Sequence, residues 1–529
     1  MNILIILLTF IAYIFYFSRF LHMFQLEGYK TKNFIEWVAN NTKKFIIPST
    51  FLMIGIILIP ILLKLNVQHI YFYLIAVPQL VFYIYDILKF KKTEFKKPLV
   101  YTWRAKRILI VGIILFLLYE ILAYIISNIF NFEFTYLILF LLTYGITGDA
   151  VIYSNFILKP VEKMCGNKYI NEAKKIIDSR NDLIVIGITG SYGKTSTKFI
   201  LQTILSEKYN TYATPDSYNT TMGNVKVIRE DLTNLHQVYI SEMGARNIGD
   251  IKEICDIVKP KYGLITSIGN QHLETFKTVD NIIKTKYELM DSLPNDGIAF
   301  FPDDNSHCKK LYDKEKREKV LFGTDASDIY ATNIEVSHQG SKFTVVCKLD
   351  HTEFNCLTKL LGIHNIQNIL GCISIAKKLG LTNEEIARGV AKISSIPHRL
   401  ELIPNTNGIT IVDDAFNSNP WGAKAALDVI SKFSGNKIII TPGMIELGKD
   451  EYLANYNFGK QIAEVCTYAI LVGKNITKPI QEGLKDANFN LDNMFVVSSL
   501  NEATQMLTKI GKVGDTVLFE NDLPDNFNE

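Results

Sequence analysis

The segment LIVIGITGSYGKTST, residues 183–197, decides the fold of the larger part of this 529-residue chain. Its first seven residues form a continuous apolar run, which is typical of a strand buried on both faces of a parallel sheet. Residues 197–208, which follow, place apolar side chains at the spacing of a helix. A buried strand, a glycine-rich turn and a helix in this order predict an α/β domain, with the turn at the carboxyl edge of its sheet.

The turn has the residue types of a phosphate-binding loop. Glycines let backbone N–H groups point inward, and the N-terminus of the helix favours an anion. Lys194 is placed to reach the β- and γ-phosphates of a nucleotide, and the hydroxyl of Thr195 to bind Mg²⁺. The strict pattern has Gly or Ala at position 188, where this chain has Ile188, so a purely structural turn remains the alternative. The nucleotide contacts expected in the loop are Gly190, Ser191, Gly193, Lys194, Thr195 and Ser196.

Residues 1–158 differ from the rest of the chain because they carry long apolar runs. Five runs are long enough to cross a hydrocarbon core of about 30 Å. We therefore expect an N-terminal α-helical transmembrane bundle of about five spans, in a multi-pass protein of the cytoplasmic membrane that has membrane lipid as a partner. The runs cover residues 3–24, 45–63, 70–88, 108–129 and 134–158.

The charges between the apolar runs predict an orientation. Residues 89–107 are rich in Lys and Arg, whereas the connections near residues 65 and 131 carry almost no positive charge. The positive-inside rule then places the amino terminus outside and the catalytic domains, after residue 159, in the cytoplasm. The basic residues either set the topology alone or also draw an anionic head group toward the active site.

Composition excludes two other classes of function. The net charge is only +3, with no basic cluster in the remainder of the chain, so nucleic acid is not an expected partner. The seven cysteines form no C-x-x-C pair, so neither a disulfide framework nor a zinc site is expected.

A series of segments beyond the loop resembles the Mur ligase family, whose phosphate loops share the departure at position 188. Within the family, the segments 412–420 (VDDAFNSNP) and 443–448 (GMIELG) are similar to the branch that joins D-alanyl-D-alanine to a UDP-N-acetylmuramoyl-tripeptide. The other similar segments are residues 217–223, 241–245, 266–273, 285–288, 361–368 and 397–401.

The resemblance implies a metal site beside the phosphate loop. Thr195 would bind one Mg²⁺, and Glu242 and His272 a second. Lys286 lies where several members of the family carry a carbamylated lysine, which would supply metal-binding oxygens. The alternative for Lys286 is an ordinary surface lysine.

The resemblance also implies contacts to ATP from other parts of the chain. Asn365 and Asn368 lie in a segment similar to the one that contacts adenine, and Asp414 would accept the ribose hydroxyls. Arg399 would clamp the γ-phosphate once the domains close. Asn417 would orient the incoming amine or the phosphate. With the metal ligands, the expected catalytic residues are Lys194, Glu242, His272, Lys286, Arg399 and Asn417.

The expected organisation is therefore multi-domain. The transmembrane domain (1–158) is followed by a linker helix (159–180), a central ATP-binding α/β domain (181–398) and a Rossmann-like carboxyl-terminal α/β domain (399–529). A hinge is expected near Arg399.

The implied activity is that of a membrane-anchored, ATP-dependent and ADP-forming amide ligase of cell-wall precursor synthesis. It would activate a carboxylate acceptor, possibly lipid-linked, as an acyl phosphate for attack by an amine such as D-alanyl-D-alanine. Two alternatives stay open: a polyglutamate-type or other polymer-extending ligase, and a non-catalytic membrane scaffold that keeps the ATP site.

Two short segments depart from the pattern of the branch. Residues 301–304 (FPDD) lack the Asn that helps to frame adenine, and residues 518–525 (LFENDLPD) stand where Lys-Gly-Ser is usual. The second departure bears on the choice of amine.

Overall fold

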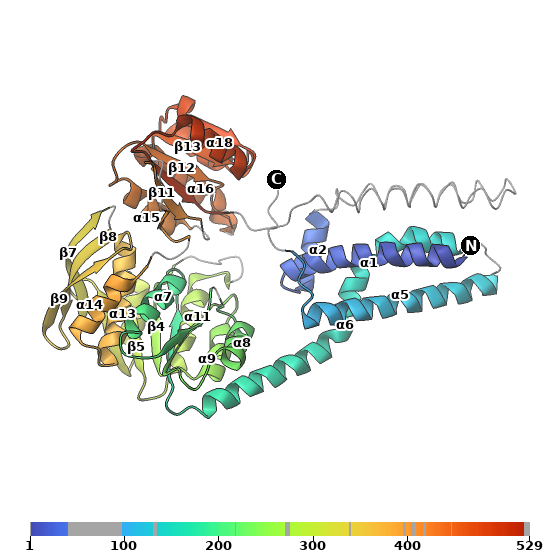
Figure 1. Ribbon diagram of the computed structural model, residues 1–529, viewed down its shortest axis with the longest axis horizontal. Coiled ribbons are helices and arrows are strands. Elements are labelled where there is room, and N and C mark those ends of the chain that lie inside the picture. The colour runs from blue at the N-terminus through green and yellow to red at the C-terminus, as the bar shows by residue number, and fades with distance from the viewer. Residues whose placement is uncertain are drawn as a thin grey trace. The chain divides into compact units, whose positions relative to one another are not determined.

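The computed structural model describes residues 2–40, 98–130, 135–216, 218–269, 276–337, 340–394, 398–403, 408–415, 419–445 and 447–522. The chain divides into two compact units, Met1–Asn167 and Lys168–Pro524 (Figure 1). Each unit is described by itself below.

The described part of the amino-terminal unit is helical. Aromatic side chains of its first helix form the core: Tyr13 and Phe17 are buried, and Tyr13 packs on Phe116 with ring centroids 4.7 Å apart. The hydroxyl of Tyr13 donates to the carbonyl of Gly112 over 2.8 Å. A Cβ at Gly112 would lie 2.3 Å from the Phe17 ring, so glycine lets the two helices approach closely. The helices are α1 (Asn2–Leu26), α2 (Thr31–Asn40), α5 (Trp103–Phe130) and α6 (Thr135–Asp178).

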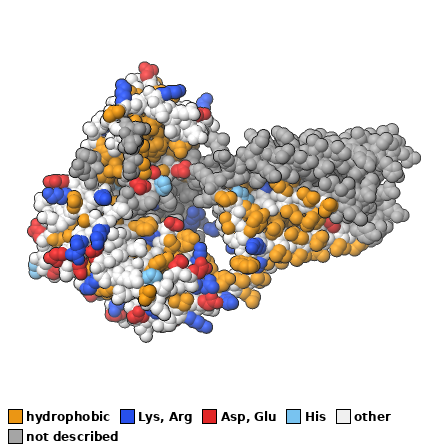
Figure 2. All heavy atoms as spheres, in the orientation of Figure 1, with side chains coloured by type: hydrophobic (Ala, Val, Ile, Leu, Met, Phe, Trp, Pro, Cys, Tyr) orange, Lys and Arg blue, Asp and Glu red, His pale blue; other side chains and the backbone are white. Residues whose placement is uncertain are grey.

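The apolar runs are distributed differently from the prediction. Some apolar side chains of α1 and α5 are buried in contacts between helices. Others are exposed, as the hydrophobic side chains in Figure 2 show. The predicted fifth span and the predicted linker helix form one 44-residue helix, α6, whose second half is strongly charged. Arg107 on α5 donates to both carboxylate oxygens of Glu162 on α6, at 2.7 and 2.8 Å.

Among the residues that the structure describes, no helix combines the length and the unbroken apolar character needed to cross a membrane. The predicted transmembrane bundle, and with it the multi-pass membrane location, is therefore wrong for this part of the chain. The membrane lipid expected as a partner rested on the same spans and has no support. The predicted spans at 45–63 and 70–88 lie outside the described residues.

The second unit begins with a nine-stranded sheet of order β2-β3-β1-β4-β5-β6-β7-β8-β9. Strands β1 to β7 pair in parallel, and β7, β8 and β9 form an antiparallel meander. The strands are β1 (Ile184–Thr189), β2 (Thr211–Ala213), β3 (Val238–Glu242), β4 (Tyr262–Ile265), β5 (Ile298–Pro302), β6 (Glu318–Gly323), β7 (Ile329–Ser337), β8 (Gly340–Cys347) and β9 (Thr352–Thr358).

Two cores cover the two faces of this sheet. One core includes buried residues of the helices α7 (Lys194–Leu205), α13 (Ile363–Lys378) and α14 (Asn383–Lys392). The other includes residues of α8 (Thr221–Glu230), α9 (Asp250–Val258), α11 (Val279–Asp291) and α12 (Ser306–Lys314). Because both faces are covered, β1 is apolar throughout, as its sequence predicts.

A six-stranded sheet of order β10-β11-β15-β12-β13-β14 follows. All its pairs are parallel except that of β10 with β11. Its strands are β10 (Glu401–Ile403), β11 (Thr410–Asp414), β12 (Lys437–Thr441), β13 (Tyr468–Val472), β14 (Met494–Val497) and β15 (Thr516–Glu520). Its helices are α15 (Pro420–Ile430), α16 (Glu451–Val465), α17 (Lys478–Asp486) and α18 (Leu500–Ile510). The two predicted α/β domains are thus confirmed, the second with a Rossmann-like parallel core.

Candidate functional site

The phosphate loop lies between β1 and α7, at the carboxyl edge of the first sheet. Its conformation requires two glycines: Gly190 has φ +152° and Gly193 has φ +79°. A Cβ at Gly190 would lie 2.0 Å from Oγ1 of Thr266, and one at Gly193 would lie 2.9 Å from Oδ1 of Asn368. The backbone therefore approaches its neighbours as closely as a phosphate-binding turn must.

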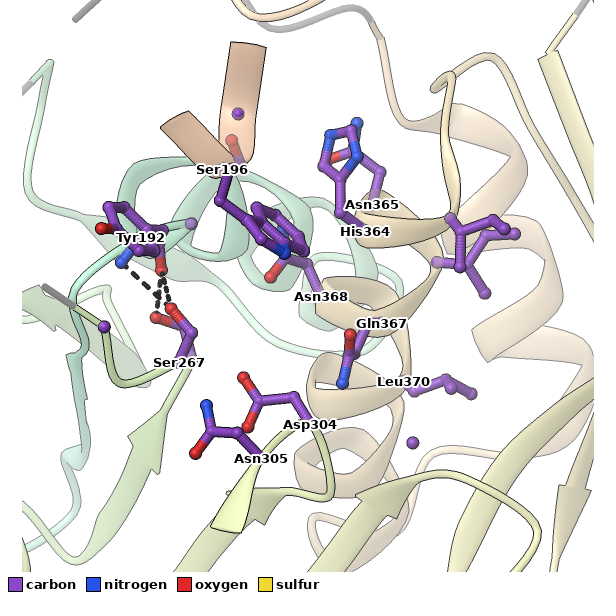
Figure 3. Close-up of a pocket in the computed structure, with 18 of the residues that line it drawn as sticks. Tyr192, Ser196, Ser267, Asp304, Asn305, His364, Asn365, Gln367, Asn368 and Leu370 are labelled. Carbon is purple, nitrogen blue, oxygen red and sulfur yellow. Dashed lines mark hydrogen bonds between the residues drawn. The ribbon is translucent and has the colours of Figure 1, made fainter. Parts of the chain in front are cut away.

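The segment after β4 braces this loop. The amide of Ser191 donates to the carbonyl of Ser267 over 2.8 Å. The amide of Tyr192 donates to the hydroxyl of Ser267 over 3.1 Å, as Figure 3 shows. The Ser191 hydroxyl donates to the carbonyl of Gly269 over 3.0 Å. These contacts with the segment after β4 hold the loop in shape.

Lys194 folds back into the loop. Its ammonium donates to the carbonyls of Gly190 (2.7 Å) and Ser191 (3.0 Å). Burial lowers the pKa of Lys194 to about 8, opposed by Glu242 and reinforced by the nearby Arg399. A triphosphate would restore the full charge of this amine by replacing the missing solvation.

Glu242, at the end of β3, is completely buried and forms the centre of a polar cluster. Its Oε1 accepts from the Thr195 hydroxyl and from the side-chain amide of Asn219, each over 3.1 Å. Its Oε2 lies 3.0 Å from the ammonium of Lys198, which is equally buried. The structure thus brings the predicted Thr195 and Glu242 into direct contact.

The sequence reasoning missed Lys198. A lysine on an amphipathic helix is ordinarily exposed, and α7 carries Lys198 one turn after Lys194 without any motif to mark it. The available signal was that the first turn of this helix must face the same anionic site as the loop.

Lys286 is not a surface residue, because it is buried on α11. Burial and, secondarily, the nearby Lys194 lower the pKa of Lys286 well below its usual range. The neutral amine is the form that reacts with carbon dioxide, so this environment suits the predicted carbamate, which stays a prediction.

The loop opens into a cavity of about 860 Å³. Middle-domain residues line one part of it, and Arg399, Asp414 and Glu520 of the second domain line another. Asp414 and Glu520 are register partners at the ends of the neighbouring parallel strands β11 and β15. Burial raises the pKa of Asp414 to about 6, and Arg399 opposes this shift.

Arg399 sits in an unusual turn. Its neighbours His398 and Leu400 both have a left-handed backbone, with φ of +58° and +47°. The amide of Leu400 donates to Asp414 over 3.1 Å, and Nδ1 of His398 lies 2.7 Å from Oδ2 of Asp413. Both aspartates of the segment 412–420 therefore hold the turn that presents Arg399 to the cavity.

The segment expected to contact adenine lies at the start of α13. Figure 3 shows His364, Asn365, Gln367 and Asn368 around the cavity. The Asn365 side chain donates to the carbonyl of Leu361 over 2.8 Å, so one of its functions is to cap the turn. Asn368 lies against Gly193, which joins α13 to the phosphate loop.

Asp304 and Asn305, which follow β5, also line the cavity. Asp304 has its pKa raised to about 6 by burial. Asn305 donates to the carbonyl of Ile268 over 3.1 Å and caps α12. The sequence pattern predicts only that an Asn is missing before Asp303, whereas in the structure Asn305 supplies an amide just after it.

Two of the predicted catalytic residues, His272 and Asn417, lie outside the described residues. Within the described ranges, no cluster of three or more His, Cys, Asp or Glu side chains could hold a metal ion. Mg²⁺ in nucleotide sites is usually held by one or two protein oxygens together with phosphates and water, and Thr195 with Glu242 fits that pattern.

A braced glycine loop on a parallel sheet, facing an arginine from a second α/β domain, defines a two-domain nucleotide-dependent enzyme. Two family models agree with this class: the Mur ligase middle domain matches residues 188–376, and the Mur ligase, glutamate ligase domain matches residues 398–520. The chain belongs to the Mur ligase family. Members of this family are ATP-dependent, ADP-forming peptide ligases that use Mg²⁺, in agreement with the predicted enzyme class and cofactors.

Two curated relatives of this chain carry the same name. The chain is 32% identical over 288 residues to the UDP-N-acetylmuramoyl-tripeptide--D-alanyl-D-alanine ligase of Buchnera aphidicola subsp. Baizongia pistaciae, covering 54% of this chain and 62% of the relative. It is 30% identical over 279 residues to the enzyme of that name from Escherichia coli strain K12, covering 52% and 61%. The chain thus spans about three fifths of the length of these two relatives.

Two solved structures of MurF enzymes resemble this chain as well. MurF from Acinetobacter baumannii superposes with a TM-score of 0.62 at 26% identity, over 68% of this chain and 77% of that one. The MurF ligase from Thermotoga maritima in complex with ADP superposes with a TM-score of 0.61 at 23% identity, over 68% and 80%, and supports the fold alone. The predicted resemblance to this branch is therefore confirmed.

Proposed function

We propose that this chain is a MurF-like ligase of peptidoglycan-precursor synthesis, which joins an amine such as D-alanyl-D-alanine to a peptide carboxylate and converts ATP to ADP. One observation carries the proposal: a single cavity is lined by Gly193 and Ser196 of the phosphate loop and by Arg399 and Asp414 of the second domain. Arg399 also lies near enough to Lys194 to lower the pKa of that lysine. A site built from both domains can hold a nucleotide and a second reactant together, which supplies much of the rate.

The electrostatic difficulty of this reaction is that a carboxylate must approach a triphosphate. The loop amides and Lys194 bind the phosphates, and Arg399 neutralises them from the opposite domain. Thr195 and Glu242 are the residues that would hold Mg²⁺, which when bound further neutralises phosphate charge. The ammonium of Lys198, 3.0 Å from Oε2, helps to hold the buried Glu242 side chain in place.

The remaining site residues have proposed roles as well. Lys286, as a carbamate, would add negative oxygens near the metal; His272 and Asn417 keep the roles that the resemblance implies. Asp414 would accept the ribose hydroxyls, and Asn365 and Asn368 would border the base. The identity of the acceptor is the least constrained part of the proposal.

The test supplies the purified chain with ATP, Mg²⁺, D-alanyl-D-alanine and UDP-N-acetylmuramoyl-tripeptide, and follows ADP release and product mass. We expect ADP release that depends on both the amine and the acceptor, and its loss in Lys194→Ala. Lys252→Ala, which removes only an exposed ion pair with Asp256, is the matched control. Glutamate addition to a polymer would indicate the polymer-extending alternative, and ADP release that no acceptor stimulates would contradict ligase activity.

A further inference from the structure

A tryptophan at the start of α15 borders the cavity. Trp421 is the second residue of this helix and keeps 53% of its surface exposed. Its backbone is firmly held, because the Asn419 side chain accepts from the amide of Gly422 over 2.9 Å and Pro420 opens the helix. The ring is therefore presented from a fixed position.

Further apolar side chains surround the same part of the cavity. Ile363, at the start of α13, is 59% exposed, and Ile334 of β7 is also exposed. Isolated exposed apolar residues are common, but here residues of α13, β7 and α15 meet around one cavity. This part of the cavity is apolar, whereas the part lined by Gly193 and Ser196 of the phosphate loop is polar.

The ring of Trp421 contacts a residue of the other domain. Its ring lies edge to face with His364 of α13, with centroids 5.8 Å apart and planes at 79°. Burial lowers the pKa of His364 to about 4, so the imidazole is neutral near pH 7 and the contact is between two uncharged rings. Because more than half of Trp421 is exposed, this contact leaves room for a second flat ring.

We propose that Trp421 is a specificity-determining residue that stacks on the base of the nucleotide, and so couples base binding to the approach of the second domain. The inference rests on the proposed function, in which the loop binds the triphosphate. Stacking of a base on an aromatic ring predicts an effect on ligands that carry a base and little effect on a bare phosphate chain.

The test measures dissociation constants by calorimetry for ATP, ADP and inorganic tripolyphosphate. We expect Trp421→Ala to raise the dissociation constants of ATP and ADP at least about fivefold and that of tripolyphosphate less than twofold. The dissociation constants of Trp421→Phe should stay near those of the wild type. Leu453→Ala, which removes an equally exposed apolar side chain of α16, is the control. Retained tripolyphosphate binding shows that the variant is folded.

Fluorescence provides an independent readout. The chain has three tryptophans, so in a Trp37→Phe/Trp103→Phe background only Trp421 emits. We expect ATP to change this emission and tripolyphosphate to leave it unchanged. An unchanged ATP affinity in Trp421→Ala, or an equal loss for ATP and tripolyphosphate, overturns the stacking role while leaving the nucleotide site intact. No binding of ATP to the wild type overturns both proposals.

Discussion

The buried ion pair between Lys198 and Glu242 should be costly to break. The two side chains are 0% and 1% exposed, and the ammonium lies 3.0 Å from Oε2. Lys198→Met keeps the length and apolar stem of the side chain but removes the charge. Among the described residues, Glu242 then keeps direct contacts with two neutral donors, Thr195 and Asn219.

The size of the effect follows from burial. Removing one partner of a buried ion pair typically costs about 3–5 kcal/mol, because the other charge stays desolvated. At about 1.4 kcal/mol for each factor of ten, protection of local amides against hydrogen exchange should fall about 100- to 4,000-fold. Lys252→Met is the control, since its pair with Asp256 is exposed and worth less than about 1 kcal/mol.

The assay is hydrogen exchange followed by mass spectrometry on peptides that cover α7 and β3, without Mg²⁺ or nucleotide. The double variant Lys198→Met/Glu242→Gln removes the stranded charge as well, so it should lose less stability than the two single effects added together. If Lys198→Met exchanges like Lys252→Met, or if the two single effects simply add, the pair is not a coupled buried contact and the reasoning fails.

Three further outcomes are expected. Since the pKa of Lys194 is about 8, the affinity of the wild type for ATP, measured by calorimetry, should fall as the pH rises above 8. Lys194→Arg should bind ATP with an affinity that does not change with pH in this range, and the same constancy in the wild type would contradict the prediction. Burial raises the pKa of Asp304 from 3.8 to about 6, so its charge destabilises the fold above pH 6 and not below about pH 4. Asp304→Asn should therefore raise the free energy of unfolding at pH 8, by up to about 3 kcal/mol, and leave it unchanged near pH 4, which thermal melting at the two pH values measures. Glu242→Gln should raise the Mg²⁺ concentration needed for half-maximal ATP turnover at least about tenfold, and an unchanged Mg²⁺ titration would remove Glu242 from the metal site.

The phosphate loop could be predicted because its parts are contiguous. Within the 14 residues Leu183–Ser196, a buried strand is followed by two glycines with positive φ and then by Lys-Thr. The order of residues along the chain was therefore enough to locate Lys194 and Thr195. The two α/β domains could be predicted for a similar reason, since apolar runs alternating with helical periodicity require a parallel sheet covered on both faces.

The amino-terminal region shows where local patterns fail. Hydropathy counts apolar side chains but not what they pack against, and here Tyr13, Phe17 and Phe116 pack between α1 and α5. The helix does not end at the predicted boundary, residue 158, because Pro160 is accommodated inside the continuous helix α6, and the two compact units divide at Asn167.

The rest of the site was decided by the tertiary structure. Lys198 becomes the partner of Glu242 only because α7 packs over the end of β3, and a helix sequence alone does not say which lysine will be buried. Asp414 and Glu520 meet because parallel pairing aligns the ends of β11 and β15, although more than a hundred residues separate them in the chain. Contacts of this kind depend on strand order and register, which are set by the packing of the whole sheet and leave no mark in neighbouring residues.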